Sequence, residues 1–380
     1  MRIQKLSNDV AIEKLLQELG VDSGGIKILA SKAKVHLFAL KALHVGAANI
    51  LKQDALSVGA DLAVPRGTVI AKEERVDCVL IATTKQLQIL AKKELAQPFG
   101  LKDVAKELQN YLAVPKTPAT KIMGVINAND DSFYAGSRFV GKDALAKIEQ
   151  MVQDGADIID IGGVSSRPNA PIVSAKEELV RVTPILEAIY EAKLYEDVRF
   201  SIDSYQPAVV QKALESGFGI INDITGFQND QLCRLAGRYG ATAVVMHMQG
   251  TPQTMQSSPS YDDVVLDIYD YLQQQMHKVQ SFGVRDIVLD VGIGFGKTVE
   301  DNLQLIKHLE HFKMLGCELL VGASRKSMID KIHPSDVAKR LAGTLTLHLE
   351  AVKNGASIIR VHDVFEHKQA LEVQKALLRA

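Results

Sequence analysis

The chain has few of the features that secreted, zinc-stabilised or membrane proteins require. Its 380 residues include three cysteines, Cys78, Cys233 and Cys317, which lie far apart and form no Cys-x-x-Cys pair. This pattern argues against a disulfide framework or a structural zinc site and favours a reducing compartment. No run approaches the roughly 18 apolar residues of a membrane span. The charged segment 1–16 also lacks the apolar centre of a signal peptide.

An excess of charge of either sign is also missing. The formal net charge is −1 and the isoelectric point is about 6.8, so bulk electrostatics predict neither a nucleic-acid partner nor a membrane surface. The chain does have a hydrophobic content of 47% and a charged content of 23%, which are typical of a globular protein with a sizeable core. Together these features predict a cytoplasmic enzyme.

Residues 113–120, AVPKTPAT, form the clearest boundary, because two prolines in this short stretch disfavour helix and suit a linker. Residues 1–112 mix helix-like stretches, DVAIEKLLQEL and VHLFALKALHVGAANIL, with the short apolar runs IKILA and VDCVLIAT. We interpret them as a small α/β domain that serves oligomerisation or support, since they contain no recognisable chemical motif.

From Lys121 to the C-terminus, short β-branched runs alternate with amphipathic helical stretches, as in a parallel sheet built from βα units. The runs are KIMGVIN (121–127), DIIDIG (157–162), VRFSID (198–203), GIIND (219–223), TAVVMHM (242–248), DIVLD (286–290), ELLVGAS (318–324) and SIIRVH (357–362). Eight repeats within residues 121–380 have the size and count of a (β/α)8, or TIM, barrel. A doubly wound sheet is the alternative, but it rarely needs eight consecutive parallel strands.

Nearly every one of these runs ends on a polar residue. The strand-end residues are Asn127, Asp160, Asp203, Asn222, His247, Asp290, Ser324, Lys326, Arg360 and His362. A single Asp or Asn at such a place can be a helix cap. Ten polar residues in the same register of the repeat instead predict an active site at the C-terminal face of the barrel.

The charges in this set suggest a ligand. Arg360 and His362 lie two residues apart and so face the same side of the last strand, above Ile358. Ser324 and Lys326 pair in the same way if their strand stays extended. An Arg, a Lys and a His that converge on one mouth favour a phosphate or diphosphate group.

The carboxylates and amides would face the other part of the ligand. Asp203, Asn222 and Asp290 suit the edge of a flat heterocycle that has N–H donors and a carbonyl acceptor. For Asp290 and Lys326 the alternative is an internal ion pair. The nearby VGIGFGKT (291–298) is neither a P-loop, which needs glycine where Val291 stands, nor a dinucleotide fingerprint, which needs glycine where Lys297 stands.

Eight segments in chain order resemble the motifs of the dihydropteroate synthase family. They are KIMGVINANDDSF, DIIDIGGVSSRP, FSIDSY, IINDITG, VMHMQG, LDVGIGFGKT, VGASRKSMI and RVHDV. The resemblance covers residues 121–380 and implies a pterin-binding TIM barrel of folate synthesis. Such a transferase joins 4-aminobenzoate to (7,8-dihydropterin-6-yl)methyl diphosphate, giving 7,8-dihydropteroate and diphosphate.

The resemblance also implies roles for individual residues. The expected catalytic residues are Lys326, Arg360, His362 and Asp203. The expected pterin ligands are Asp203, Asn222, Met246, Asp290 and Lys326. Those expected to border the aminobenzoate, or a sulfonamide that mimics it, are Ser166, Arg167, Pro168, Phe295 and Ser324. The diphosphate is expected at Asn127, Arg360 and His362, with Mg²⁺ beside Asn127. Asp131 and Phe133 would lie on a loop that closes over the site, and a homodimer is the family's habit.

Several loop residues depart from the family pattern. Asn129 and Asp130 replace Thr and Pro, Val164 replaces Glu, Ser166 replaces Thr, Asn169 replaces Gly and Val291 replaces Pro. These changes bear on loop geometry more than on pterin binding, and Ser166 keeps the hydroxyl of Thr.

Three rival hypotheses remain open. One is a methyltetrahydrofolate–corrinoid methyltransferase, which shares the barrel but needs no diphosphate site. Another is a non-catalytic pterin-binding protein. The third, a fused dihydroneopterin aldolase in residues 1–112, has no motif in its favour.

Overall fold

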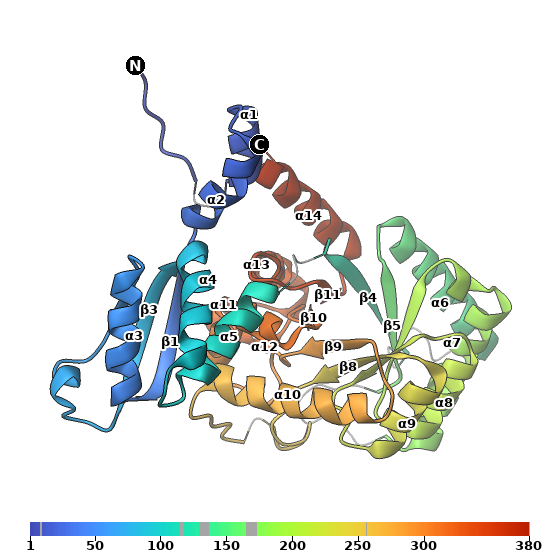
Figure 1. The fold of residues 1–380 in the computed structure, drawn as a ribbon. Coiled ribbons are helices and arrows are strands. Elements are labelled where there is room, and N and C mark those ends of the chain that lie inside the picture. The colour runs from blue at the N-terminus through green and yellow to red at the C-terminus, as the bar shows by residue number, and fades with distance from the viewer. Residues whose placement is uncertain (8–9, 115–117, 129–136, 165–172, 256, 380) are drawn as a thin grey trace. The chain divides into compact units, whose positions relative to one another are not determined.

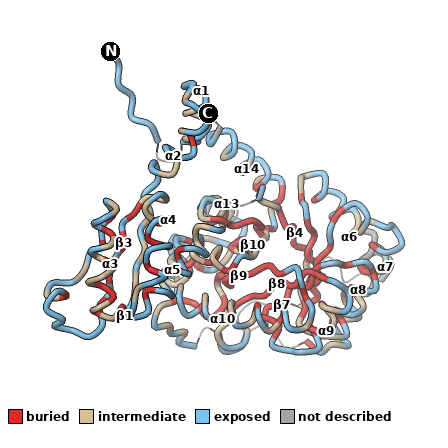
Figure 2. The backbone as a smooth tube through the Cα atoms, in the orientation of Figure 1, coloured by how far each residue is buried: buried red, intermediate tan, exposed pale blue. Residues whose placement is uncertain are grey.

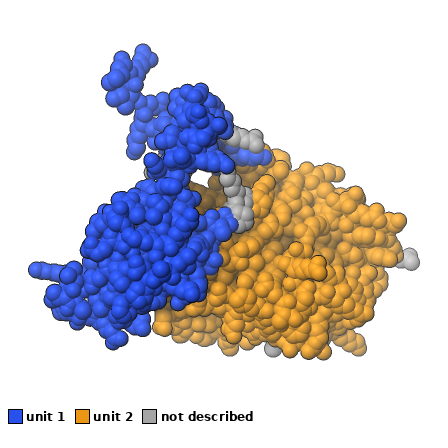
Figure 3. Space-filling view, in the orientation of Figure 1, with its two compact units in different colours: residues 1–115, 375–380 blue, residues 116–374 orange. Residues whose placement is uncertain are grey.

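The fold was analysed in a computed structural model that describes residues 1–7, 10–114, 118–128, 137–164, 173–255 and 257–379. The chain divides into two compact units, Met1–Pro115 with Lys375–Ala380, and Lys116–Gln374 (Figure 3). None of the helices in these described ranges combines the length and the apolar character that crossing a membrane requires.

The larger unit is a closed barrel of eight parallel strands in the order β10-β11-β4-β5-β6-β7-β8-β9 (Figure 1). The strands are β4 (Lys121–Asn127), β5 (Ile158–Gly162), β6 (Arg199–Asp203), β7 (Ile220–Asp223), β8 (Thr242–Met246), β9 (Ile287–Asp290), β10 (Glu318–Val321) and β11 (Ile358–Val361). This confirms the predicted α/β class and the TIM barrel.

Helices follow the strands around the barrel. They are α6 (Ser137–Gln153), α7 (Ala175–Glu191), α8 (Pro207–Glu215), α9 (Asp230–Tyr239), α10 (Val264–Ser281), α11 (Val299–Lys307), α12 (Ser327–Ile332), α13 (Leu341–Lys353) and α14 (Val364–Arg379). Local signals start several of them. Pro207 opens α8, and Thr298 forms a capping box with Asp301 at the start of α11.

Alternation along each strand separates two apolar layers, and the buried residues concentrate in the strands (Figure 2). One set of side chains fills the barrel: Met123, Ile158, Ile220, Val244, Val288, Leu320 and Ile358. Their neighbours along the strands, such as Ile359 and Val361, pack outward among the helices. The barrel interior is therefore closed by a hydrophobic floor, and residues two positions further along each strand lie above it.

The smaller unit is built on a three-stranded antiparallel sheet in the order β1-β3-β2. Its strands are β1 (Val35–His44), β2 (Asp61–Ala63) and β3 (Arg75–Thr83), and its helices are α1 (Ile12–Glu18), α2 (Ser23–Ala33), α3 (Val45–Ser57), α4 (Thr84–Lys93) and α5 (Leu101–Ala113). Alternate β3 residues, including Leu80, join residues of α3, α4 and α5 in a core of their own. The α/β prediction for this region is confirmed.

Three local predictions were wrong. VHLFALKALH is strand β1 and not the start of a helix, because it pairs with β3. IKILA lies inside α2, which begins where the Asp22 carboxylate accepts a hydrogen bond from the Gly24 N–H. The run ELLVGAS stops being a strand at Val321, so Ser324 and Lys326 lie on a turn and not on an extended strand.

Candidate functional site

The polar strand-end residues lie at one level of the barrel. Asp203 pairs in register with Asn222 across β6 and β7, and Met246 pairs with Asp290 across β8 and β9. Gly162 lies between Asn127 and Asp203 in the same register, and an added Cβ there would be 3.5 Å from Asp203. Neighbouring strands thus bring these side chains together at the C-terminal end of the barrel.

An ion-pair network occupies the centre of this level. Arg360 Nε lies 2.6 Å from Asp160 Oδ2, and Arg360 Nη2 lies 2.6 Å from Asp203 Oδ2. The Asn222 amide donates to the same Asp160 oxygen over 3.2 Å. The structure therefore directs the Arg360 guanidinium toward two carboxylates inside the barrel, where the sequence had suggested contact with an anionic ligand.

Burial and neighbouring charges shift the pKa values of Asp203 and Arg360 in opposite directions. Burial raises the pKa of Asp203 to about 7, although the Arg360 charge opposes the shift. Burial alone would lower the pKa of Arg360, but Asp160 and Asp203 raise it above its ordinary value. Asp203 therefore titrates near neutral pH and is able to act as a hydrogen-bond donor or acceptor.

Asp290 lies across the barrel from this network. Its Oδ1 accepts a 2.8 Å hydrogen bond from the Gly292 N–H, and burial raises its pKa. Gly292 has φ +70°, and a Cβ there would stand 1.9 Å from the carbonyl oxygen of His247. Only glycine fits at this position, so Gly292 allows the loop after β9 to pass close to the His247 backbone.

Lys297, which suggested a P-loop, points into the protein. Its Nζ lies 3.0 Å from His247 Nδ1, 3.3 Å from the His247 carbonyl oxygen and 3.0 Å from the Phe295 carbonyl oxygen. Burial lowers its pKa to about 7, and Asp290 opposes that shift. Burial also lowers the pKa of His247 to about 2, which leaves a neutral ring to accept from the ammonium. Lys297 thus ties the loop after β9 to the end of β8.

Apolar and cationic groups meet at the edge of the site. Lys326 Nζ lies 4.2 Å from the centre of the Phe295 ring, within range of a cation–π interaction. Phe295 and Met246 belong to a small buried apolar cluster with Ile224 and Met255. A flat ring would find an apolar surface there beside the polar strand ends.

His362 and Ser324 connect the last two strands. Ser324 Oγ lies 2.8 Å from His362 Nδ1, and it also accepts from the His362 backbone N–H over 3.3 Å. Burial, followed by the charge of Arg360, lowers the pKa of His362 to about 4. His362 is therefore neutral at neutral pH and offers hydrogen bonds rather than charge to an anion.

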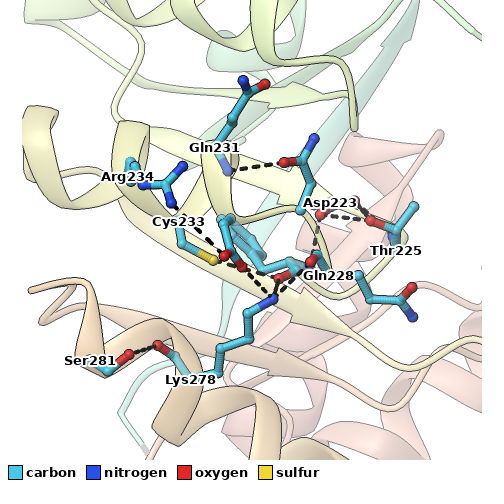
Figure 4. Close-up of polar contacts among 11 residues, drawn as sticks. Asp223, Thr225, Gln228, Gln231, Cys233, Arg234, Lys278 and Ser281 are labelled. Carbon is cyan, nitrogen blue, oxygen red and sulfur yellow. Dashed lines mark hydrogen bonds and ion pairs between the residues drawn. The ribbon is translucent and has the colours of Figure 1, made fainter.

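Hydrogen bonds to Asp223 and from Lys278 hold the loop after β7 (Figure 4). The Asp223 carboxylate accepts from the Thr225 N–H over 2.7 Å and from the Phe227 N–H over 2.8 Å. Lys278 donates to the Phe227 carbonyl over 3.1 Å. These bonds stabilise the positive φ of 58° at Phe227, a conformation that costs a non-glycine residue free energy. They also anchor the end of the strand that carries Asn222.

Asn127 ends β4 and is partly exposed, so its amide oxygen is available to a ligand. Among the described residues, no three His, Cys, Asp or Glu side chains are placed to hold a metal ion. One amide oxygen suits Mg²⁺ that arrives with a diphosphate, because Mg²⁺ keeps several waters and takes few protein ligands. Asn127 is therefore compatible with a metal carried by the substrate.

Part of the predicted site lies outside the described residues. These positions are Asn129, Asp130, Asp131, Phe133, Ser166, Arg167, Pro168 and Asn169. The remaining predicted residues gather around the barrel mouth as described above. The roles expected from the resemblance did not include Asp160 and Lys297. Asp160 ended a predicted strand and so could have been included, whereas Lys297 stood in a motif that matched no nucleotide-binding pattern.

Comparisons with known proteins show what the chain resembles. A family described as "Pterin binding enzyme" matches residues 123–362. The bifunctional dihydropteroate synthase/dihydropteroate reductase of Helicobacter pylori is 43% identical over 377 residues, covering 99% of each chain. The dihydropteroate synthase of Haemophilus influenzae is 40% identical over 272 residues, or 71% of this chain and 96% of its own. A crystal structure of the Yersinia pestis dihydropteroate synthase with a sulfonamide drug matches 69% of this chain and 95% of that chain, with 37% identity and a TM-score of 0.64.

Proposed function

Since the chain belongs to the dihydropteroate synthases of the pterin binding enzyme family, we infer that it condenses 4-aminobenzoate with (7,8-dihydropterin-6-yl)methyl diphosphate. The products are 7,8-dihydropteroate and diphosphate, and the enzyme is a transferase of folate biosynthesis. Relatives named as synthases at about 40% identity favour this reaction over a methyl transfer with the same barrel.

The observation that carries this function is the arrangement of Asp203, Asn222 and Asp290 above the barrel floor. Carboxyl and amide groups at one level match the N–H donors and carbonyl acceptor along one edge of a pterin. Met246 and Phe295 supply an apolar surface for the ring. The site is thus suited to a flat, hydrogen-bonding heterocycle in a largely buried position.

We assign the diphosphate to the mouth of the barrel. Arg360 and His362 extend from β11, and Lys326 lies on the turn after β10. Arg360 is already paired with carboxylates, so its contribution is to keep the site's net charge low and to orient Asp203. Lys326 and the neutral imidazole of His362 would meet the phosphate oxygens. Mg²⁺, held by Asn127 together with the substrate, would neutralise charge on the leaving diphosphate.

The chemical step needs no nucleophilic side chain. The C–O bond between the pterin methylene and the diphosphate breaks, and the amine nitrogen of 4-aminobenzoate forms a bond to that carbon and loses a proton. The electron-rich dihydropterin shares the positive charge that develops on the methylene, so a dissociative displacement is favoured. The protein's work is then to position both substrates and to stabilise the departing anion.

We propose that Phe295 and Ser324, with Ser166, Arg167 and Pro168, border the aminobenzoate. The position of Phe295 under Lys326 supports this, because the ring lies next to the cation expected to contact both substrates. The Yersinia pestis relative is described in a sulfonamide complex, and sulfonamides mimic 4-aminobenzoate. We therefore expect sulfonamides to compete with 4-aminobenzoate here.

The decisive experiment measures products from the purified full-length chain. Supplied with Mg²⁺, 4-aminobenzoate and the dihydropterin diphosphate, it should release diphosphate and form dihydropteroate in equal amounts. Omission of 4-aminobenzoate is the control and should abolish product formation. Binding of both substrates with no diphosphate released would instead identify a non-catalytic binding protein.

A second activity is suggested by the relative that matches the whole chain. Its name includes a dihydropteroate reductase, and it covers 99% of this chain, whereas the Haemophilus influenzae synthase covers 71%. By subtraction we assign reductase activity to the unit Met1–Pro115. That reaction adds a hydride and a proton across a C=N bond of dihydropteroate, so it requires an external hydride donor. Oxidation of a reduced nicotinamide that depends on added dihydropteroate would support it, and its absence with an active synthase would refute it.

A further inference from the structure

The turn that follows β10, residues 322–326, carries Ser324 and Lys326 into the site. Arg325 in this turn has a positive φ of 55°, which is unfavourable for a residue with a side chain. A turn of this kind keeps its shape only when its neighbours hold it. The contacts that hold it come from helices α13 and α14, behind the barrel strands.

Helix α13 presents a ladder of side chains to this turn. Thr344 Oγ1 accepts a 2.9 Å hydrogen bond from the Arg325 N–H, and His348 Nε2 accepts a 3.0 Å bond from the Ala323 N–H. Thr344 and His348 are four residues apart, so they lie on the same face of the helix. Arg340, one turn earlier, donates to the Arg325 carbonyl over 3.3 Å. Thr344 and His348 are both fully enclosed, at 0% and 1% exposure.

The hydrogen bonds of His348 fix its own tautomer and that of a second histidine, His367. Because His348 Nε2 accepts from Ala323, its proton must reside on Nδ1, which lies 2.8 Å from His367 Nε2. His367 then carries its own proton on Nδ1, 2.6 Å from the Asp363 carbonyl oxygen. This chain of bonds is complete only if both rings are neutral and both are protonated on Nδ1. Burial favours that state, since it lowers the pKa of each ring.

Asp363 connects this chain of hydrogen bonds back to Arg325 in the turn. Asp363 accepts from His367 through its carbonyl, and its carboxylate pairs with Arg325, whose Nε lies 3.0 Å away. The turn after β10 and the first residues after β11 are therefore linked twice, once through the two histidines and once through this ion pair. Loss of any of these hydrogen bonds or of the ion pair would change the distance between Lys326 and the residues of β11.

We propose that Thr344, His348 and His367 are positioning residues that set the Ser324–Lys326 turn against the end of β11, and thereby tune the capture of the dihydropterin diphosphate. None of them touches substrate. They act through Lys326 and Ser324, so this inference rests on the proposed synthase function. The competing explanation is that the three residues only fill the space between helices and strands.

Thr344→Val is the sharpest substitution, because it keeps the shape of the side chain and removes the hydroxyl that accepts from the Arg325 N–H and donates to the Arg340 carbonyl. We expect the KM for the dihydropterin diphosphate to rise about tenfold, on the scale of one lost hydrogen bond to a buried backbone group. The matched control is Thr346→Val on the exposed face of the same helix, where Thr346 bonds only within the helix. It should leave both KM and kcat unchanged.

His348→Leu and His348→Gln form a second pair. The leucine removes the acceptor for Ala323, whereas the glutamine amide oxygen is able to replace it, so glutamine should restore much of the lost affinity. A lower unfolding temperature with an unchanged KM in Thr344→Val and in both His348 variants would overturn the proposal. If His348→Leu does not fold, Thr344→Val and His348→Gln still decide the question.

The imidazoles themselves provide a test that needs no substrate. In ¹⁵N-histidine-labelled protein at pH 7, we expect two rings with the neutral, Nδ1-protonated pattern of nitrogen shifts. In His348→Gln the His348 signal is lost, whereas His367 should keep its pattern because its Nδ1–H still donates to the Asp363 carbonyl. A proton on Nε2 or a charged ring at either position would overturn the proposal. A wild-type chain that shows the expected spectrum but releases no diphosphate would contradict the proposed function and leave the network intact.

Discussion

Arg360 lies between the carboxylates of Asp160 and Asp203, each 2.6 Å away, in a site where Asp290 is also buried. Without the guanidinium, two carboxylates would face each other at low dielectric, and both would tend to take up protons. At this scale Arg360 acts on substrate indirectly, because it keeps Asp203 in place and able to bond the pterin. We propose that Lys326 makes the more direct contact with the diphosphate.

Removal of either cation should therefore impair the synthase reaction. Arg360→Ala and Lys326→Ala should each lower kcat/KM at least about 100-fold, the scale of one preorganised charge. Arg360→Lys should not restore activity, since an ammonium is unable to span two carboxylates as a guanidinium does. Steady-state diphosphate release measures these effects. Near-normal rates in both alanine variants would contradict the site assignment.

Glu94, in the smaller unit, offers a pH-dependent test of stability. It is 0% exposed, and burial, followed by the charge of Asp54, raises its pKa from 4.5 to about 7. A carboxyl whose folded pKa is raised stabilises the fold below its unfolded pKa. That contribution is lost as the pH rises from about 4.5 to about 7.

We therefore expect Glu94→Gln to flatten the pH dependence of this unit and to raise its stability above that of the wild type at pH 8, by on the order of 1 kcal/mol or more. Denaturant unfolding at pH 5 and pH 8 measures the difference. Glu107→Gln, at an exposed position of α5, is the matched control and should keep the wild-type pH profile. Parallel curves for Glu94→Gln and the wild type would rule out a protonated Glu94.

The residues that line the site were predictable to the extent that they follow the strand period. Asn222, Asp290 and Arg360 end apolar runs, so alternation alone places them inside the barrel mouth. The partner of Arg360 was not predictable, because Asp160 and Asp203 are selected by their distance across neighbouring strands. That choice depends on barrel register and not on local sequence.

At the scale of elements, the loop from Val291 to Lys297 shows how a motif that resembles a nucleotide-binding loop serves another purpose. Gly292 approaches the His247 carbonyl, and Gly296 would clash with the Gln249 carbonyl, 2.4 Å away, if it carried a Cβ. Lys297 fills the space inside the bend and satisfies two carbonyl oxygens. The loop is thereby rigid enough to hold Phe295 beneath Lys326.

Lys297→Met should loosen this loop while keeping the length of the side chain. Two buried carbonyls would lose their donor, at a cost of about 1–3 kcal/mol each. We expect the KM for the dihydropterin diphosphate to rise about tenfold with a smaller change in kcat, because the ring surface shifts while the diphosphate contacts remain. Lys307→Met on the exposed side of α11 serves as the control. A large fall in kcat with normal KM would indicate direct catalysis by Lys297.

The strands of the barrel were predictable because their runs are short and β-branched, and side-chain caps mark the start of some of the helices that follow, such as α7, α9 and α10. Strand β1 was not, since VHLFALKALH is rich in Leu and Ala, which favour helix, and only its pairing with β3 makes it a strand. The prediction that the strand continues to Ser324 and Lys326 was wrong for a related reason. Ser324 and Lys326 are held out of the strand by side chains of α13, which lies more than fifteen residues further along the chain.

At the scale of the whole molecule, each of the two compact units has a main hydrophobic core of its own. The core of the smaller unit contains Leu51, Leu80 and Leu90, whereas that of the barrel contains Phe200 and Phe312, and no described residue belongs to both. Each core is large enough to support its own cooperative transition. This arrangement suits a protein that combines a synthase barrel with a unit of separate chemistry.

Calorimetry of the full chain should consequently resolve two transitions that respond to different perturbations. Leu80→Ala opens a cavity in the core of the smaller unit. It should lower the free energy of unfolding by about 2–5 kcal/mol for only one of the two transitions. A pterin ligand at 100 times its dissociation constant should raise the free energy of unfolding of the other transition alone, by about 2.7 kcal/mol. The synthase activity of Leu80→Ala, measured at a temperature between the two transitions, then tests whether the barrel works while the smaller unit is unfolded. Full activity there would mean that the barrel needs no folded partner unit, whereas a single transition moved by both perturbations would show that the two cores fold as one.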